Sequence, residues 1–343
     1  MSVAYPFVFN FAVSHTGGGR KRLVEYARWF DEQGGAFFIV NARIEEALRT
    51  SFPRNRYFPV NQPLYERVFA DCKYLGDVEE QVGTPELYYS FGIPVYRRFG
   101  RVNWFHLSNV LPIHHRGKIP LAFLDRLKAS YLGGRMRAHY GNADVISSES
   151  SWALGLIEVP EREKLFLSVN GSDDEIHYLR SPTTPNRTDT AMIVGTYRYK
   201  ALGDSYRVFS MLRESNPTLR LTIAGDTRHI PRELGSTDAV LPLGVIDRSE
   251  VIERLRVARY YISTTLIESG YNAASEGAGL AQESYLSDIG PHRELLDGVR
   301  FRRVSVPGVA RPLLHVMGQD LSTARLKSWN EVITDMLAKL ATV

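Results

Sequence analysis

A complete strand–helix–strand pattern occupies residues 7–40, FVFNFAVSHTGGGRKRLVEYARWFDEQGGAFFIV. Its first residues are rich in β-branched and aromatic types, which favours a strand. A glycine run follows at 17–19, and then Leu23, Ala27 and Phe30 recur at the i, i+4, i+7 spacing of a helix. The glycine pair at 34–35 ends this helix, and another apolar run follows at 36–40. We therefore predict a βαβ unit whose parallel strands are joined by a right-handed crossover.

A second series of the same kind follows residues 181–188, a segment rich in proline and threonine that suits an exposed connection between domains. We predict strands at 191–194, 219–224, 260–264 and 284–287. A helix containing residues 206–212 lies between the first two. Another begins with the capping-box spacing Asp247–Glu250 and is expected to bury Val251, Leu255 and Ala258.

Strand–helix alternation in two series predicts an α/β protein of two facing, doubly wound Rossmann-like domains. We place the first domain at residues 1–180 and the second at 188–326. Residues 50–100 give weak signals, and we assign no elements there. Ligands of such sheets bind beyond the carboxyl ends of the strands, so a cleft between the domains is the expected site.

Composition limits the possible functions. The 343 residues include 42 basic and 38 acidic ones, a net charge of +4 that is too small to indicate a nucleic-acid binder. No apolar run approaches the ~18 residues that cross a bilayer, and the start, MSVAYP, does not resemble a signal peptide. The single cysteine, Cys72, excludes an internal disulfide and a multi-cysteine zinc site, so we expect a cytoplasmic protein.

Two glutamates stand eight positions apart in residues 265–280, TLIESGYNAASEGAGL, on a loop that follows a strand and begins a helix. Glu268 is expected at the carboxyl end of the strand and Glu276 in an early turn of the helix. The free backbone N–H groups around 271–274 favour an anionic ligand. The two carboxylates would suit a ribose and a sugar ring. An ordinary acidic loop with a solvated helical glutamate is the alternative.

Extended to residue 296, this segment resembles the C-terminal signature of the family 4 retaining glycosyltransferases, which have the two-domain GT-B fold. Other stretches resemble motifs of that family in the same order. They are the glycine loop at 16–22, a serine-containing helix entry at 143–150, an Asn-Gly linker at 169–173, a basic turn at 194–200, a strand at 219–226 and a helix start at 327–329. The last helix, 327–343, is expected to pack back on the first domain.

The resemblance implies roles for individual residues. Glu268 would face the donor sugar, Glu276 would hold the nucleotide ribose, and Lys200 would neutralise the leaving diphosphate. The remaining donor-binding candidates are Gly195, Arg198, Asn272 and Ala273, with Gly18 and Gly19 of the N-terminal loop. Arg198 and Lys200 are alternatives for the diphosphate, and either can be an ordinary surface residue.

The sequence departs from the family pattern after the first glutamate. It has Ser-Gly-Tyr-Asn-Ala at 269–273 where the family has Gly-Phe-Gly-Leu-Pro, and Thr196 stands where the family has arginine. Asn272 adds a polar side chain near the donor sugar, so the identity of that sugar is open.

His106, in WFHLSN at 104–109, resembles a family segment that reaches the cleft and is the third catalytic candidate. A structural hydrogen-bonding role is the alternative. The sequence has no Asp-x-Asp triplet and no histidine–cysteine set with metal-ligand spacing, so we expect neither a metal nor a resident cofactor. We predict a solvated turn at 173–175.

A basic, apolar stretch runs from Ile113 to His139. Its cations, Arg116, Lys118, Arg126, Lys128, Arg135 and Arg137, accompany one acid, Asp125. Apolar residues alternate with them at Phe123, Leu124, Leu127, Tyr131 and Leu132. This pattern is typical of a helix on an anionic membrane surface and equally of a solvated helix face. A peripheral location on the cytoplasmic membrane face is one expectation.

Together these features predict a retaining glycosyltransferase. It would transfer a hexose-type sugar from a nucleotide-diphosphate sugar to a glycan or lipid-linked acceptor, in polysaccharide biosynthesis. The alternatives are a sugar-nucleotide epimerase of the same architecture and a catalytically degenerate nucleotide-binding interaction protein.

Overall fold

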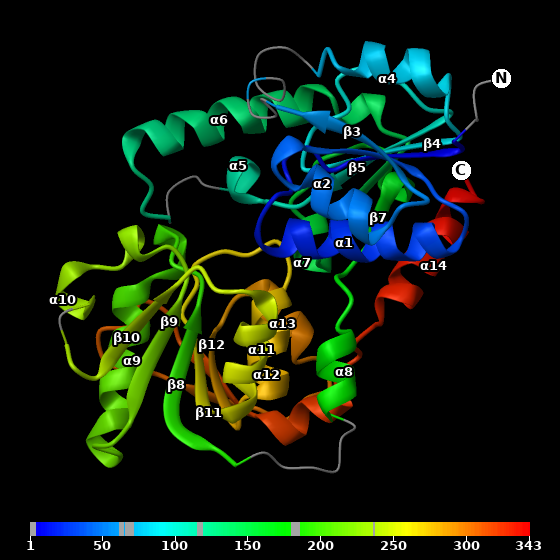
Figure 1. Ribbon diagram of the computed structural model, residues 1–343. Coiled ribbons are helices and arrows are strands. Elements are labelled where there is room, and N and C mark those ends of the chain that lie inside the picture. The colour runs from blue at the N-terminus through cyan, green and yellow to red at the C-terminus, as the bar shows by residue number, and fades with distance from the viewer. Residues whose placement is uncertain (1–4, 62–64, 66–71, 115–118, 180–185, 236) are drawn as a thin grey trace. The chain divides into compact units, whose positions relative to one another are not determined.

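The computed structural model describes residues 5–61, 65, 72–114, 119–179, 186–235 and 237–343, which form two compact units (Figure 1). The first unit contains the described residues of Met1–His115, Leu124–Gly171 and Trp329–Val343. The second contains those of Arg116–Phe123 and Ser172–Ser328. Each unit is built around one seven-stranded sheet.

The sheet of the first unit is parallel throughout. In spatial order its strands are β3 (Arg56–Val60), β2 (Phe37–Asn41), β1 (Phe7–Asn10), β4 (Leu87–Phe91), β5 (Val102–Leu107), β6 (Val145–Ser148) and β7 (Leu165–Leu167). The order reverses direction between β1 and β4, so the crevice of this unit lies at their carboxyl ends.

Helices cover both faces of the first sheet, as right-handed crossovers in opposite directions require. The helices of this unit are α1 (Gly17–Glu32), α2 (Ala42–Ser51), α4 (Leu75–Val82), α5 (Leu111–His114), α6 (Phe123–Ala138), α7 (Ser151–Leu154) and α14 (Trp329–Leu340). In Figure 1, α4 and α6 lie on one side of the sheet, and α1 and α14 on the other.

The sheet of the second unit is parallel except at one edge. Its strands, in spatial order, are β10 (Val240–Gly244), β9 (Arg220–Ala224), β8 (Thr188–Val194), β11 (Ala258–Ser263), β12 (Glu283–Ser287), β14 (Leu313–Met317) and β13 (Arg302–Val304). The last two strands pair antiparallel. The reversal of strand order falls between β8 and β11.

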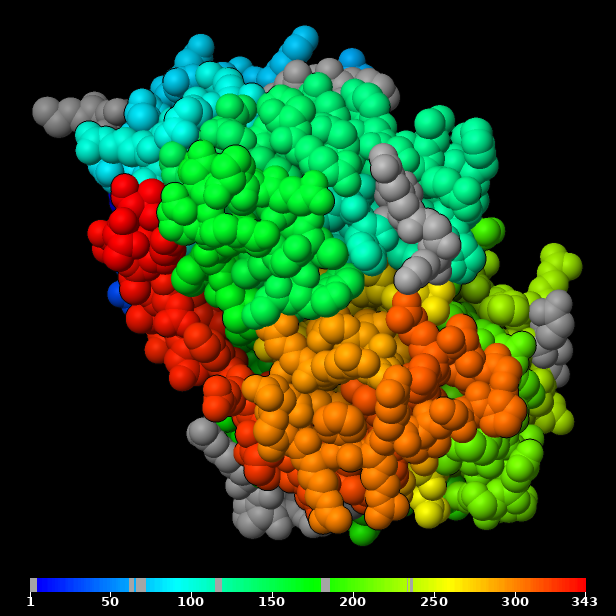
Figure 2. Space-filling view, turned by 180° about the vertical axis from the view of Figure 1, so that it is seen from behind, coloured from blue at the N-terminus to red at the C-terminus, as the bar shows by residue number. Residues whose placement is uncertain are grey.

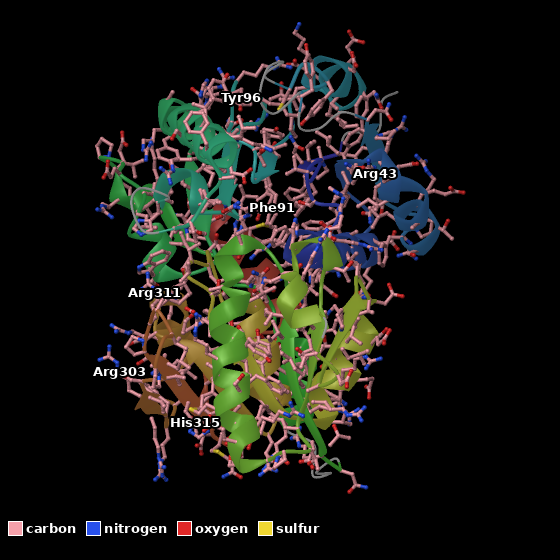
Figure 3. All side chains as sticks on the ribbon, turned by 90° about the vertical axis from the view of Figure 1, so that its left-hand side faces the viewer. Arg43, Phe91, Tyr96, Arg303, Arg311 and His315 are labelled. Carbon is pink, nitrogen blue, oxygen red and sulfur yellow. The ribbon has the colours of Figure 1, made fainter. Side chains whose placement is uncertain are left out.

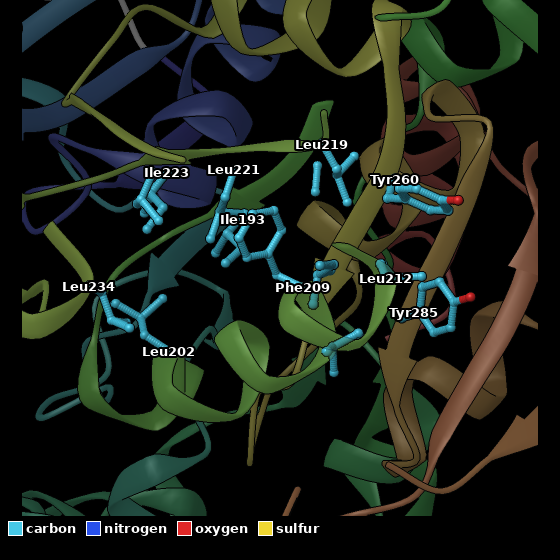
Figure 4. Packing of buried hydrophobic residues seen from close by; sticks show 14 of the residues in the cluster. Ile193, Leu202, Phe209, Leu212, Leu219, Leu221, Ile223, Leu234, Tyr260 and Tyr285 are labelled. Atoms are coloured by element: carbon cyan, nitrogen blue, oxygen red, sulfur yellow. The ribbon is translucent and has the colours of Figure 1, made fainter. Parts of the chain in front are cut away.

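Successive residues of a strand point to opposite sides of the sheet, and in the second sheet both sets are buried. Ile193 packs against α9, whereas its neighbour Met192 packs on the side of α11 and α12. Figure 4 shows Ile193, Leu221 and Phe209 in the cluster on the α9 side. The helices are α8 (Asp173–Leu179), α9 (Leu202–Ser215), α10 (Arg232–Gly235), α11 (Arg248–Val257), α12 (Asn272–Leu280) and α13 (Gly290–Leu295).

The C-terminal helix α14 belongs to the first unit. Trp329 is buried and packs edge-on against Tyr26 of α1, with ring centroids 6.3 Å apart. Near the end of the helix, Lys339 Nζ donates to the carbonyl of Glu163 at 3.3 Å. The red C-terminal helix and the green segment around residue 160 lie side by side in Figure 2.

The predicted fold class, two doubly wound α/β sheets, is confirmed. Several details differ from the prediction. Asp173–Leu179 is a helix grouped with the second unit, although we expected the first domain to continue to residue 180. Ala258 is the first residue of β11 and not part of the helix. Asp247 precedes α11 but makes no capping hydrogen bond through its side chain. Most of the predicted connection at 181–188 lies outside the described residues.

Candidate functional site

The predicted donor-binding residues gather at the reversal of strand order in the second sheet. β8 ends at Val194 and β11 at Ser263, and these strands are neighbours. The loop after β8 carries Lys200, and the loop after β11 carries Glu268. This position is the ligand-binding crevice of a doubly wound sheet.

Hydrogen bonds hold the two loops together. The backbone N–H of Leu266 donates to the carbonyl of Tyr199 at 2.7 Å. The hydroxyl of Thr264 donates to the carbonyl of Ala201 at 2.9 Å and bonds to the hydroxyl of Ser205 at 2.7 Å. The short turn Arg198–Lys200 therefore has a fixed position beside the loop of Glu268.

Lys200 and Glu268 form an ion pair, with Nζ 2.5 Å from Oε1. Their side chains are only 12% and 24% exposed. Gly195 makes room for the lysine, because a Cβ built at this residue would lie 3.1 Å from Lys200 Cε. Its φ of +90° is also unfavourable for other residue types. The turn after β8 therefore places the Lys200 cation beside the Glu268 carboxylate of the neighbouring loop.

The structure separates the two candidate cations. Arg198 is exposed, whereas Lys200 is largely buried against Glu268. Of the two, Lys200 is thus the one held within the crevice of the second unit.

Glu276 is buried in α12 and bonds to Arg248, the first residue of α11. The same guanidinium donates to Asp174 of α8 at 2.7 Å. Burial acts to lower the pKa of Arg248, but the charges and hydrogen bonds of Glu276 and Asp174 outweigh burial and raise it. Arg248 remains a cation that holds the Glu276 carboxylate in place. Arg248 was not predicted from the sequence, because Asp247–Glu250 has the spacing of a capping box.

The solvated turn predicted at 173–175 is wrong. Glu175 is buried in α8, and its Oε1 accepts a hydrogen bond from Ser275 of α12 at 2.8 Å. α8 therefore packs against α12, and two of the three acids contact residues beside the donor-binding candidates.

Asn272 and Ala273 are the first two residues of α12. Backbone N–H groups at a helix start have no acceptor within the helix, so those of these two residues are available to an anion. Gly277 lets α12 approach the sheet, because a Cβ there would lie 2.0 Å from the ring of Tyr261. This close approach fixes α12 against β11.

His292 is a further buried residue beside this site, and the sequence analysis gave it no role. Its Nδ1 lies 2.8 Å from the carbonyl of Ser287, so Nδ1 carries the proton. Burial lowers the pKa of His292 to about 4. The charge of Glu268 acts to raise this pKa, and the charge of Lys200 acts to lower it. The ring is therefore neutral near pH 7. His292 lies in residues 288–294, within the stretch that resembles the family 4 signature, and this resemblance could have indicated it as a candidate.

The first unit contains the other candidates. Gly18 and Gly19 lie in the first turn of α1, at the carboxyl end of β1. A Cβ at Gly19 would lie 3.0 Å from the ring of Phe91, which ends β4 and is labelled in Figure 3. This glycine loop therefore stands at the reversal point of the first sheet.

His106 is completely buried within β5. Its Nδ1 lies 2.8 Å from the hydroxyl of Ser147, and its ring stacks on Phe91 with centroids 4.9 Å apart. Nε2 is 3.8 Å from the carboxylate of Glu149. Burial and the charge of Arg22 lower the pKa of His106 to about 4. This geometry matches the structural alternative that the sequence left open.

Arg22 is a buried cation that the sequence analysis did not single out. Its guanidinium donates to the carbonyls of Ser168 and Val169 at 2.7 and 2.8 Å and to Asn170 Oδ1 at 3.2 Å. Burial acts to raise the pKa of Glu149, but its interaction with the nearby His106 and the charge of Arg22 outweigh burial and lower that pKa. The network ties α1 to the segment before residue 171.

Metal ligands are not clustered in the part of the chain that the structure describes. No group of three or more histidine, cysteine, aspartate or glutamate side chains there is arranged to hold an ion.

Comparison with known proteins identifies the architecture. No protein-family model matches the chain, and no curated protein is a detectable relative. Among solved structures, Anabaena HepE in complex with UDP-glucose is 17% identical, with a TM-score of 0.59 over 98% of this chain and 91% of that one. Sucrose-phosphate synthase from Thermosynechococcus elongatus is 11% identical, with a TM-score of 0.64 over 98% of both chains. The chain has the GT-B fold.

This GT-B fold is shared by a protein of another enzyme class. A proposed UDP-N-acetylglucosamine 2-epimerase from Listeria monocytogenes is 11% identical, with a TM-score of 0.56 over 99% of this chain and 91% of that one. The fold alone therefore leaves both enzyme classes open, and the choice depends on the site.

Proposed function

We propose that this protein is a retaining glycosyltransferase that transfers a hexose from a nucleotide-diphosphate sugar to a glycan or lipid-linked acceptor. The observation that carries the proposal is the Lys200–Glu268 pair beside the start of α12, at the strand-order reversal of the second sheet. A cation, free backbone N–H groups and carboxylates at one crevice match the parts of a nucleotide-sugar donor.

In this proposal the diphosphate binds Lys200 and the N–H groups of Asn272 and Ala273. Lys200 Nζ leaves Glu268 for a phosphate oxygen, so the Glu268 carboxylate turns to the hydroxyls of the donor sugar. Glu276, oriented by Arg248, accepts hydrogen bonds from the ribose hydroxyls. These fixed charges stabilise the negative charge that the diphosphate gains as the glycosidic bond breaks.

Retention would follow from attack on the same face that the diphosphate leaves. The acceptor hydroxyl forms the new bond to the anomeric carbon, and its proton passes to the departing diphosphate. His106 is buried and neutral, so we assign it a structural hydrogen-bonding role and not a catalytic one.

UDP-glucose is the first donor to test, because the structure of Anabaena HepE contains it. We propose polysaccharide biosynthesis as the context, and the cytoplasm as the location because the chain has a single cysteine.

The test combines binding and turnover. Thermal-shift screening of UDP-, GDP-, dTDP- and ADP-sugars identifies the donor, since a ligand of the folded state stabilises it. With that donor, Lys200→Ala and Glu268→Ala are expected to lower kcat about 100-fold or more. Lys164→Ala, which removes a partly exposed ion pair with Glu161 in the first unit, is the matched control and should retain activity. Near-normal transfer by both site variants would refute the proposal.

Metal removal gives an independent check. Because Lys200 and the helix N–H groups supply the positive charge, excess EDTA should leave transfer unchanged. A complete loss of activity, restored by Mg²⁺ or Mn²⁺, would contradict this part of the mechanism.

The second candidate is a sugar-nucleotide epimerase, favoured by the similarity to the Listeria protein. An epimerase would convert the donor sugar without any acceptor. A transferase would form a glycosidic product only when an acceptor is present. Proton NMR of the donor alone, incubated with the protein, distinguishes the two.

A further inference from the structure

Helix α6 exposes an apolar stripe to solvent. Phe123, Leu124, Leu127 and Tyr131 are 77%, 74%, 60% and 46% exposed. Leu124, Leu127 and Tyr131 follow one another at spacings of three and four residues, and Phe123 lies four residues before Leu127, so all four share one side of the helix. The stripe is about 12 Å long at 1.5 Å per residue. Four adjoining large apolar side chains with this exposure are unusual for a surface helix and indicate a contact surface.

The opposite side of α6 packs against the first unit. Its buried residues are Ala129, Leu132, Gly133 and Met136. At about 100° per residue, this set lies roughly half a turn from the apolar stripe. Arg135 stacks over Tyr96 (labelled in Figure 3) at 4.6 Å, and Arg137 donates to the carbonyl of Ile113 at 3.2 Å. The orientation of the helix is therefore fixed, with its stripe facing outward.

Cations lie on both sides of the stripe. Arg126 and Arg137 fall on one flank, and Lys128 and Arg135 on the other, while the single acid of the helix is Asp125. Arg126 and Lys128 are exposed. An apolar stripe between two basic rows is the arrangement that lets a helix lie in a bilayer interface, with its cations at the lipid headgroups.

We propose that α6 binds the surface of an anionic lipid bilayer. The apolar stripe would enter the boundary between headgroups and acyl chains, and Arg126 and Lys128 would contact lipid phosphates. A second copy of the chain fits less well, because symmetric pairing of the stripes would bring basic rows together. Arg116 and Lys118, which we included in the basic stretch, lie outside the described residues. The proposal does not depend on the transferase activity.

No helix in the described part of the chain is long and apolar enough to cross a bilayer, so the contact proposed is with the membrane surface. Attraction to an anionic surface strengthens binding about fivefold per basic residue, so the loss of two should weaken it about 25-fold. Binding should also weaken as salt is raised.

Vesicle flotation of the full chain tests the proposal. Vesicles of phosphatidylcholine mixed with phosphatidylglycerol should carry the protein upward, and vesicles of phosphatidylcholine alone should not. L124S/L127S should abolish flotation, and R126Q/K128Q should weaken it about 25-fold.

Matched controls come from the second unit. Val245, 82% exposed, provides the apolar control V245S, and Arg300 and Arg302, both exposed, provide the charge control R300Q/R302Q. Both controls should float like the unmodified protein. Every substituted side chain is exposed, so each variant should fold. Thermal unfolding of each variant would check this.

Equal flotation with neutral and anionic vesicles would overturn the proposal. So would normal flotation of both α6 variants. If no vesicle binds and light scattering detects a dimer that L124S/L127S dissociates, the stripe is a self-association surface and the membrane assignment is wrong.

Discussion

Lys200 Nζ lies 2.5 Å from Glu268 Oε1, so in the proposed mechanism a diphosphate competes with the glutamate for the lysine. One exchange of partners would therefore free a carboxylate for the sugar at the moment when the phosphates arrive. Glu276 differs, because Arg248 holds it without competing for the phosphates in the proposed mechanism. At this scale both carboxylates and the lysine were candidates proposed from the sequence, and their role in binding stays a prediction. The sequence could not identify Arg248, whose partners lie 28 and 74 positions away in the chain.

Gly195→Ala should destabilise the protein and impair transfer. The φ of +90° is in the region unfavourable for alanine, which costs about 1–2 kcal/mol, and the new methyl group would press on the Lys200 side chain. Chemical denaturation measures the first effect and kcat the second. Gly298→Ala is the control, since Gly298 has a φ of +75° with nothing within 4 Å of a Cβ. The Gly298→Ala variant should lose a similar amount of unfolding free energy, and its kcat should stay unchanged. Equal kcat values for the two variants would contradict the role of Gly195.

Stability should fall as the pH is lowered from about 6.5 to about 4. His106 and His292 are buried and neutral, and burial lowers both pKa values to about 4. The unfolded chain therefore binds more protons than the native protein between this value and about 6.5. Protonation of each histidine in the unfolded chain should lower the free energy of unfolding by up to about 3 kcal/mol. The free energy is unaffected above about pH 6.5, and the loss grows as the pH falls toward about 4.

Denaturant titrations between pH 4.5 and 8, chosen to bracket about 6.5, would measure this dependence. His106→Gln should reduce the slope of unfolding free energy against pH in the acidic range and leave the plateau near pH 8 flat. An unchanged slope in this variant would show that His106 is already protonated in the folded protein.

At the scale of elements, α12 has the central position in the candidate site. It begins with Asn272 after the loop that follows β11, carries Glu276, and packs against α8 through Ser275 and Glu175. Periodicity was enough to predict β1, β2 and α1 of the first unit and β8, β9, β11, β12 and α9 of the second. It was not enough for β3, α4 and β4, which lie in the stretch 50–100 where no elements were assigned. Nor was it enough for α8, because three consecutive acids resemble a solvated turn until a tertiary contact buries one of them. Arg22 was missed for the same reason, since it stands in the run Arg20–Arg22 and nothing in the sequence indicates its burial.

Gly277→Ala should disrupt the packing of α12. Its Cβ would lie 2.0 Å from the ring of the fully buried Tyr261, so the helix or the ring must move. Overpacking of this kind costs about 3 kcal/mol. Thermal and chemical denaturation should both detect the loss.

Gly134→Ala in α6 is the control for that substitution, because a Cβ there has nothing within 4 Å. It should stabilise the protein by about 0.5–1 kcal/mol through helix propensity alone. Equal stabilities of the two variants would mean that α12 is not packed as described.

At the scale of the whole molecule, the first unit is completed by a helix from the other end of the chain. Trp329, Val332, Ile333 and Met336 of α14 are buried. Sequence similarity of 327–329 to a family motif indicated a helix start here. The same resemblance led us to expect that helix 327–343 packs back on the first domain, and the grouping of α14 with the first unit agrees. No local pattern encodes such a long-range contact.

Removal of residues 329–343 should therefore destabilise the first unit selectively. Hydrogen exchange of the truncated chain should lose protection in the strands β1, β4 and β5 and keep it in β8, β9 and β11. A uniform change in both sheets, or none, would contradict the assignment of α14 to the first unit. Trp329→Ala in the full chain should give the same pattern in weaker form, with a loss of about 3 kcal/mol or more.

The return of α14 also fixes the order in which the units can be finished during synthesis. Residues 172–328, the main body of the second unit, form one continuous stretch, whereas the first unit lacks α14 until the ribosome has passed Leu340. At ~5–20 residues per second, Tyr26 and its neighbours must wait many seconds for their cover after the first sheet has been made. The half of the protein that is translated first is thus completed last, and its unfinished apolar face is where a chaperone would bind a nascent chain.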